Sequence, residues 1–100
     1  MSDLTNDLRL AIDTGKVSFG HRSVIRNISS GNAKAVVIAS KGRKGIVDDI
    51  IHMCEIAKIR AIKFSGNGIE LGTACGRPYS VTSLAVIDAG NSQILNQEYA

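Results

Sequence analysis

The chain has 100 residues, which suffices for one domain with its own hydrophobic core and leaves no room for a second. With 44% hydrophobic and 21% charged residues, its composition is that of a folded globular protein and excludes a disordered chain. No apolar run approaches the ~20 residues of a membrane span, and the opening MSDLTNDLRL lacks the apolar stretch of a secretory signal. We therefore expect a single domain over residues 1–100, located in the cytoplasm and not bound to a membrane.

The basic residues are distributed unevenly along the chain. The net charge is +3, yet no acidic residue occurs between Asp13 and Asp48. The cations of that interval are Lys16, Arg22, Arg26, Lys34, Lys41, Arg43 and Lys44. Such a distribution favours an anionic partner, with a solvated basic face as the alternative. Because the interval has no amphipathic helix bearing aromatic residues, we expect a nucleic acid rather than a membrane surface.

The spacing of apolar residues in the first part of the chain predicts two helices and two strands in alternation. Leucine and isoleucine recur at helical spacing over residues 4–14, and Gly15 is a natural end for that helix. A short strand is expected at residues 16–19, and a second helix is expected to begin at residue 21 or 22 and to end at residue 30. The run AKAVVIA at residues 33–39 is almost continuously apolar, which is typical of a strand covered on both faces.

The remainder of the chain continues the same alternation after a basic glycine loop, SKGRKG, at residues 40–45. The expected elements are a helix over 47–57, a strand over 60–64, a short helix over 69–75, a strand over 81–88 and a weak helix over 92–97. Helices and strands that alternate at short spacing indicate one sheet with helices on both faces. We therefore expect an α/β protein with a three-layer α/β/α sandwich.

Residues 68–81, GIELGTACGRPYSV, form the segment most suggestive of a binding site. Its closely spaced glycines allow tight bends and close approach to another surface. Pro78 fixes its own φ and disfavours a helical conformation at Arg77, so the loop is expected to be stiff. Tyr79 is suited to stacking on an unpaired base while Arg77 contacts a phosphate. The alternative for Tyr79 is burial in the hydrophobic core.

Four runs occur in order along the chain: GKVSFGHRS, GNAKAVVIAS, ELGTACGRPYSV and SLAVIDAGNSQIL. Together they resemble the L-thirty-e family of archaeal and eukaryotic large-subunit ribosomal proteins, which belongs to the superfamily that binds kink-turn RNA. The resemblance covers residues 4–95. It implies a central four-stranded mixed sheet within the sandwich, with RNA bound at one end by three segments.

Those segments are the start of the second helix, the loop after the central strand and the loop after the short helix. The implied RNA-binding residues are Gly20, His21, Arg22, Ser23, Arg26, Ser40, Lys41, Arg43, Lys44, Gly76, Arg77, Pro78, Tyr79 and Val81. A helix N-terminus offers free N–H groups to phosphate, and Gly20 has no side chain to block the approach. Tyr79 and Val81 would form an apolar pocket around an unpaired nucleotide.

One residue departs from the family's pattern. Lys41 stands where the family usually has asparagine, so a point charge replaces a group able to form two directional hydrogen bonds with a base. This exchange shifts the loop from reading a base towards attracting phosphate.

Other motifs have simpler explanations than catalysis or metal binding. The GRKG tetrad within residues 40–45 matches the GxxG loop of KH domains, but it follows a strand instead of joining two helices. His52 and Cys54 fall on different faces of their helix, which favours a surface histidine and a buried thiol over a metal pair. Asp48 and Asp49 lie where they complement a helix dipole. We expect no cofactor, no metal and no catalytic residue.

The expected function is that of a non-enzymatic structural component of the large ribosomal subunit. Its expected partners are ribosomal RNA and neighbouring ribosomal proteins, with no small-molecule substrate, and outside the ribosome it would be a monomer. The alternative within the same binding mode is a kink-turn-binding subunit of a small non-ribosomal ribonucleoprotein. From other classes, an enzyme that holds a phosphorylated small molecule in the SKGRKG loop and a protein-interaction module remain as alternatives.

Overall fold

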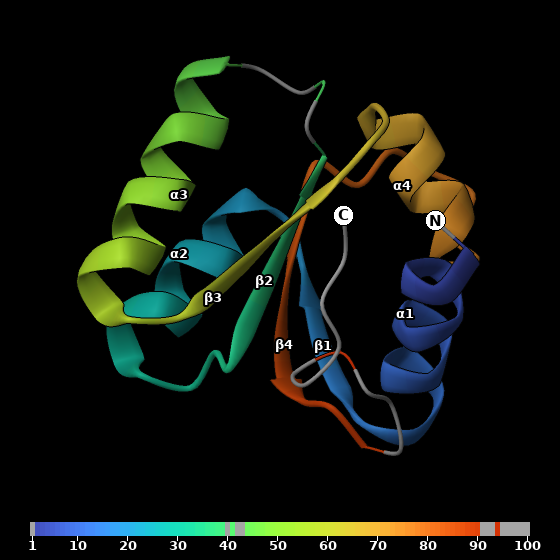
Figure 1. Ribbon diagram of the computed structural model, residues 1–100, viewed down its shortest axis with the longest axis horizontal. Helices are drawn as coiled ribbons and strands as arrows, with labels where there is room; N and C mark the ends of the chain where they lie inside the picture. Colours follow the sequence, from blue (N-terminus) through green and yellow to red (C-terminus); the bar gives the residue numbers. More distant parts are fainter. Residues whose placement is uncertain (1, 40, 42–43, 91–93, 95–100) are drawn as a thin grey trace.

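The computed structural model describes residues 2–39, 41, 44–90 and 94, within which four helices and four strands alternate. In chain order they are α1 (Ser2–Thr14), β1 (Lys16–Phe19), α2 (His21–Ser30), β2 (Ala35–Ala39), α3 (Lys44–Ala57), β3 (Arg60–Phe64), α4 (Gly68–Ala74) and β4 (Ser83–Asp88). In Figure 1, α2 and α3 lie on one side of the sheet, and α1 and α4 lie on the other. The predicted three-layer α/β/α sandwich is confirmed. None of these helices is both long and apolar enough to cross a bilayer.

The directions of the strands bring the predicted binding segments to one end of the molecule. The strand order is β1-β4-β2-β3, and β4 runs antiparallel to both β1 and β2, while β3 is parallel to β2. The sheet is therefore mixed, as predicted. The carboxyl ends of β1, β2 and β3 consequently meet the amino end of β4 at the top of the sandwich in Figure 1, which we call the upper end.

Each face of the sheet has its own hydrophobic core because side chains alternate between the faces along a strand. On the side of α1 and α4, Leu8 and Leu71 pack with Val37 and Leu84 of the central strands. On the opposite side, the core contains the buried residues Val24, Ile28, Ala33, Val36, Ile38, Ile50, Cys54 and Ala85. All five residues of β2 are buried, which confirms the prediction that this apolar run is covered on both faces.

Several predicted boundaries differ from the structure by about two residues, the usual uncertainty for element ends. β2 begins at Ala35, two residues later than predicted, and β4 begins at Ser83 instead of residue 81. α3 begins at Lys44, so the predicted extension of the preceding loop to Gly45 is wrong. The weak helix predicted over residues 92–97 falls outside the described residues, apart from Ile94.

α4 is short and depends on its cap and on a close backbone contact. The Asn67 side chain accepts a hydrogen bond from the Glu70 N–H (2.9 Å), and Glu70 accepts one from the Asn67 N–H (3.2 Å). This capping box satisfies two N–H groups at the start of the helix. Gly72 faces the loop that follows the helix, and a Cβ there would collide with the carbonyl oxygen of Tyr79. The absence of a side chain at Gly72 therefore allows the loop to lie directly on α4.

We predict that Gly72→Ala destabilises the protein by about 1–3 kcal/mol, because the added methyl group forces the backbone at Tyr79 away from α4. Chemical denaturation of the variant measures this effect. Gly45→Ala is the matched control, since nothing lies within 4 Å of a Cβ at that helical position. The control should unfold like the parent protein or at slightly higher denaturant. Equal stability of the Gly72→Ala variant and the parent would contradict the close packing of the loop on α4.

Candidate nucleic-acid interface

Two backbone hydrogen bonds at the upper end join the three predicted binding segments. The N–H of Gly20, just before α2, donates to the carbonyl oxygen of Ser83 at 3.1 Å. The N–H of Ala39, at the end of β2, donates to the carbonyl oxygen of Thr82 at 2.9 Å. Residues 82–83 thus connect the turn before α2, the end of β2 and the loop after α4, so the structure brings these segments together.

The start of α2 is open to an anion. Gly20 has φ 102° and ψ 149°, and nothing lies within 4 Å of the position that a Cβ would occupy. As the N-cap, Gly20 supplies no side chain to the helix, and the first turn contains no acidic residue. The N–H groups of this turn and the positive end of the helix dipole are therefore not neutralised by a capping side chain.

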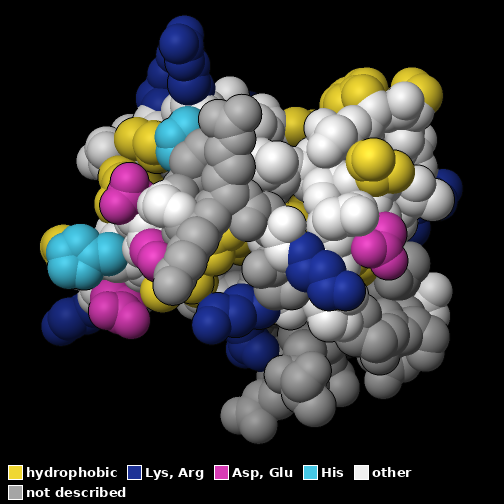
Figure 2. Space-filling model, turned by 90° about the horizontal axis from the view of Figure 1, so that it is seen from above, with side chains coloured by type: hydrophobic (Ala, Val, Ile, Leu, Met, Phe, Trp, Pro, Cys, Tyr) yellow, Lys and Arg dark blue, Asp and Glu magenta, His cyan; other side chains and the backbone are white. Residues whose placement is uncertain are grey.

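The basic side chains of α2 are placed as an anion-binding surface requires. Arg22 and Arg26 are exposed, one helical turn apart, while His21 and Ser23 are half-buried. Figure 2 looks onto the upper end and shows dark-blue side chains at its margin and near its centre. A group of hydrophobic side chains lies on its right, the side on which α4 lies in Figure 1.

The loop after α4 is fastened at both of its ends. The N–H of Arg77 donates to the carbonyl oxygen of Gly72 at 2.8 Å, and the N–H of Val81 donates to that of Gly68 at 2.9 Å. These bonds hold the loop against α4. Between the two attachments Tyr79 is 55% exposed, so the alternative that its ring fills the core is wrong.

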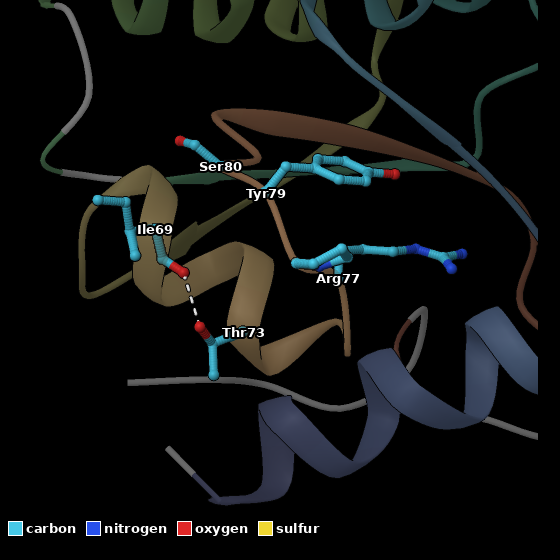
Figure 3. Close-up of a pocket in the computed structure, with 6 residues that line it drawn as sticks. Ile69, Thr73, Arg77, Tyr79 and Ser80 are labelled. Atoms are coloured by element: carbon cyan, nitrogen blue, oxygen red, sulfur yellow. Dashed lines mark hydrogen bonds between the residues drawn. The ribbon is translucent and has the colours of Figure 1, made fainter.

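A pocket of about 330 Å³ opens beside Tyr79. It is lined by Ile69, Thr73, Arg77, Pro78, Tyr79 and Ser80 (Figure 3). In Figure 3, Arg77 and Tyr79 extend from the loop in the same direction, away from the body of α4. The prediction that Val81 lines the pocket is wrong, because its side chain is only 3% exposed and packs in the core beneath the loop. Ile69, which is 69% exposed, adds to the apolar lining formed by Pro78 and Tyr79.

Arg77 is oriented by an aromatic ring from the neighbouring strand. Its guanidinium carbon lies 4.8 Å from the centre of the Phe19 ring, within the range of a cation–π interaction. The Nε atom of Arg77 is buried without a hydrogen-bond partner, as are Nδ1 of His21 and Oγ of Ser83. In the described part of the chain these three are the buried side-chain polar atoms without a partner, and they belong to the residues that form the interface.

The loop after β2 is described only in part. Lys41 is exposed, and its N–H donates to the carbonyl oxygen of Gly66 at 3.0 Å, which attaches this loop to the turn after β3. The predicted contacts Ser40 and Arg43 lie outside the described residues. Lys44 begins α3 instead of belonging to the loop.

The two side chains considered as a metal-binding pair differ in their exposure to solvent. His52 is exposed and Cys54 is buried, as expected for residues on different faces of α3. Over residues 2–39, 41, 44–90 and 94, no cluster of three or more metal-ligating side chains occurs. The open start of α2 suits an anion, and the exposed Tyr79 ring suits an aromatic partner.

The chain matches a known protein family over nearly its whole length. Residues 2–96 match the model of the ribosomal protein L7Ae/L30e/S12e/Gadd45 family. The chain belongs to this family. The predicted resemblance is confirmed over nearly the whole sequence.

Curated relatives of the L7Ae/L30e/S12e/Gadd45 family from archaea align over most of the chain. The protein named large ribosomal subunit protein eL30 from Sulfurisphaera tokodaii is 37% identical over 92% of this chain and 87% of its own length. Proteins of the same name from Methanobrevibacter smithii and Methanococcus vannielii are 34% and 37% identical. Their alignments cover 96% and 94% of this chain and 97% and 90% of the relatives.

Sequence reasoning missed two residues that shape this family member's interface, Phe19 and Ile69. Phe19 was assigned only to a strand, and its contact with Arg77 arises from distant parts of the chain. The exposure of Ile69 was easier to predict than the contact made by Phe19. Residues two apart in a helix lie on roughly opposite sides, and Leu71, two residues after Ile69 in α4, is buried.

Cys75, buried beneath the loop, generates a prediction about alkaline stability. Burial raises the pKa of its thiol to about 11 from an ordinary value of 9.0, and the nearby Arg77 and Arg9 guanidinium groups only partly oppose this shift. The unfolded chain therefore loses the thiol proton at lower pH than the folded protein does. The contribution of the neutral thiol to stability is complete below pH 9.0 and is lost as the pH approaches 11.

We expect the free energy of unfolding to fall by about 1–2 kcal/mol more in the parent than in Cys75→Ala over this interval. Denaturation curves of both proteins at a series of alkaline pH values measure the difference. The variant corrects for lysine and tyrosine ionisation, which both proteins share. Parallel pH profiles would show that the thiol does not titrate as its burial requires.

Proposed function

We propose that this protein is a non-enzymatic structural component of the large ribosomal subunit and that it binds kink-turn ribosomal RNA at the upper end. The observation that carries the proposal is the joining of the α2 N-terminus and the Tyr79 loop by the hydrogen bond between Gly20 and Ser83. The names of the archaeal relatives support the ribosomal role. The proposed location is the cytoplasmic ribosome, and the proposed partners are ribosomal RNA and neighbouring ribosomal proteins.

In this mechanism the two joined segments recognise different parts of the RNA. The uncapped start of α2 receives a phosphate, and the exposed Arg22 forms charge-assisted hydrogen bonds with a second phosphate or with a guanine edge. An unpaired nucleotide enters the pocket between Ile69 and Tyr79, where stacking on the ring contributes about 1–3 kcal/mol. A kink-turn suits both segments because it presents a bent backbone and an unstacked base together.

Lys41 modifies the selectivity of this interface. Its exposed ammonium group lies at the end of β2, within the upper end, and its N–H is fixed to Gly66. A lysine attracts phosphate without directional recognition of a base. The proposed contact at this loop therefore adds affinity that depends on salt more than on RNA sequence.

Kink-turn RNA should bind roughly 100-fold more tightly than a straight duplex of equal length and charge at about 0.15 M salt. The physical reason is that only the kinked RNA offers the phosphate and the unpaired base to the two segments at once. Titration of labelled RNAs by fluorescence anisotropy measures both affinities. Comparable affinity for the two RNAs would exclude specific recognition of the kink.

Arg22→Ala and Tyr79→Ala should each weaken kink-turn binding by about 1–3 kcal/mol, because each removes one contact of the interface. Both side chains are exposed, so the melting temperatures should stay at the parent value. Lys34→Ala is the matched control: Lys34 is an exposed cation before β2, at the end of the sheet opposite the interface. If Lys34→Ala loses as much affinity as Arg22→Ala, the loss in Arg22→Ala reflects general charge attraction and not a specific contact.

Association with the ribosome is tested separately from RNA recognition. The protein should sediment with large subunits after a high-salt wash. Recovery only in lighter particles would assign it to a small non-ribosomal ribonucleoprotein with the same mode of RNA binding.

A further inference from the structure

A residue of α1 that is absent from the predicted interface reaches the turn of the Tyr79 loop. Gly76 has φ 75°, and a Cβ at this position would lie 3.2 Å from Cζ of Arg9 and 3.3 Å from its Nη1. The guanidinium group of Arg9 therefore packs on the backbone of the turn, where a larger residue would displace it. Arg9 itself is exposed, so its charged group remains accessible to a ligand.

Arg77 follows Gly76 in the chain, so a second guanidinium group originates at the same turn. It is half-buried and held at 4.8 Å from the centre of the Phe19 ring. Its Nε atom is buried and has no hydrogen-bond partner among the described residues. Figure 3 shows this side chain beside that of Tyr79, at the pocket proposed for the unpaired nucleotide.

Arg9 and Arg77 place two positive charges at this turn. Both guanidinium groups act on the Cys75 thiol, but burial dominates and raises the pKa of that thiol to about 11, so it stays neutral at pH 7. Two cations held near one turn repel each other unless an anion lies between them. An anion bound at this turn would relieve that repulsion.

We propose that Arg9 and Arg77 together bind a single phosphate group of the RNA and thereby extend the RNA-binding surface from the upper end onto α1. The inference rests on the proposed function. Guanidinium groups form paired hydrogen bonds with phosphate oxygens, and two of them can share one phosphate from opposite sides. Because Arg77 also lines the Tyr79 pocket, this phosphate belongs to the backbone beside the nucleotide that occupies the pocket.

The test uses a set of kink-turn RNAs, each with one phosphate replaced by an uncharged methylphosphonate. For the parent protein, the replacement at the shared phosphate should weaken binding by about 10-fold. For Arg9→Ala and for Arg77→Ala the same replacement should change affinity by less than about 2-fold, because the interaction has already been lost. Lys34→Ala is the control and should keep the full penalty at that position.

Other results would contradict either this inference or the proposed function. If no position has a penalty that depends on Arg9, or if Arg9→Ala weakens all RNAs equally, Arg9 makes no phosphate contact. If Arg9 makes no phosphate contact but Arg22→Ala and Tyr79→Ala still weaken kink-turn binding, the proposed function stands and only this inference fails. A parent protein that does not distinguish the kink-turn from a duplex contradicts the proposed function itself. Arg9 is exposed in a helix, so its replacement by alanine should leave the melting temperature unchanged.

Discussion

The direction of β4 is the constraint on which the candidate nucleic-acid interface depends. Because β4 runs antiparallel to both β1 and β2, its amino end lies beside their carboxyl ends. The backbone carbonyls of Ser83 and Thr82 then accept hydrogen bonds from Gly20 and Ala39. These bonds hold an uncapped helix N-terminus, a strand end and an aromatic loop in a fixed relation. A rigid arrangement loses little conformational entropy on binding, which favours recognition of a ligand with a fixed bend.

Packing in the hydrophobic core helps to hold the loop after α4 in place. Val81 anchors the loop by burying its side chain between α4 and the sheet, and the same anchoring leaves Tyr79 exposed. Gly72 allows the loop backbone to contact α4, so the pocket beside Tyr79 is a consequence of close packing. Burial also determines the state of Cys75, whose raised thiol pKa shows that desolvation outweighs two neighbouring positive charges.

Much of the fold could be predicted from the sequence because its strongest signals are local. The bounds of β1 and β3 were predicted correctly from short apolar runs and glycines, and α2 begins at the first of the two starts predicted for it. The strands predicted at 33–39 and 81–88 each begin two residues before the strand that the structure shows. Ala33 and Val81 are apolar because they are buried next to the sheet, and a pattern of hydrophobicity does not distinguish burial from strand pairing. Val81 was assigned to the pocket from the family resemblance, which gives its position in the loop and not its burial.

The sequence by itself determined the identity and order of the elements, the stiff loop with an aromatic tip and the concentration of positive charge before Asp48. These properties depend on neighbouring residues, through helical and strand periodicity and through the restricted backbone of proline. Only the tertiary structure decided that Phe19 orients Arg77, that Ile69 lines the pocket and that Arg9 reaches Gly76. Each of these contacts joins elements distant along the chain, and its geometry follows from the strand order and from how closely the helices pack on the sheet.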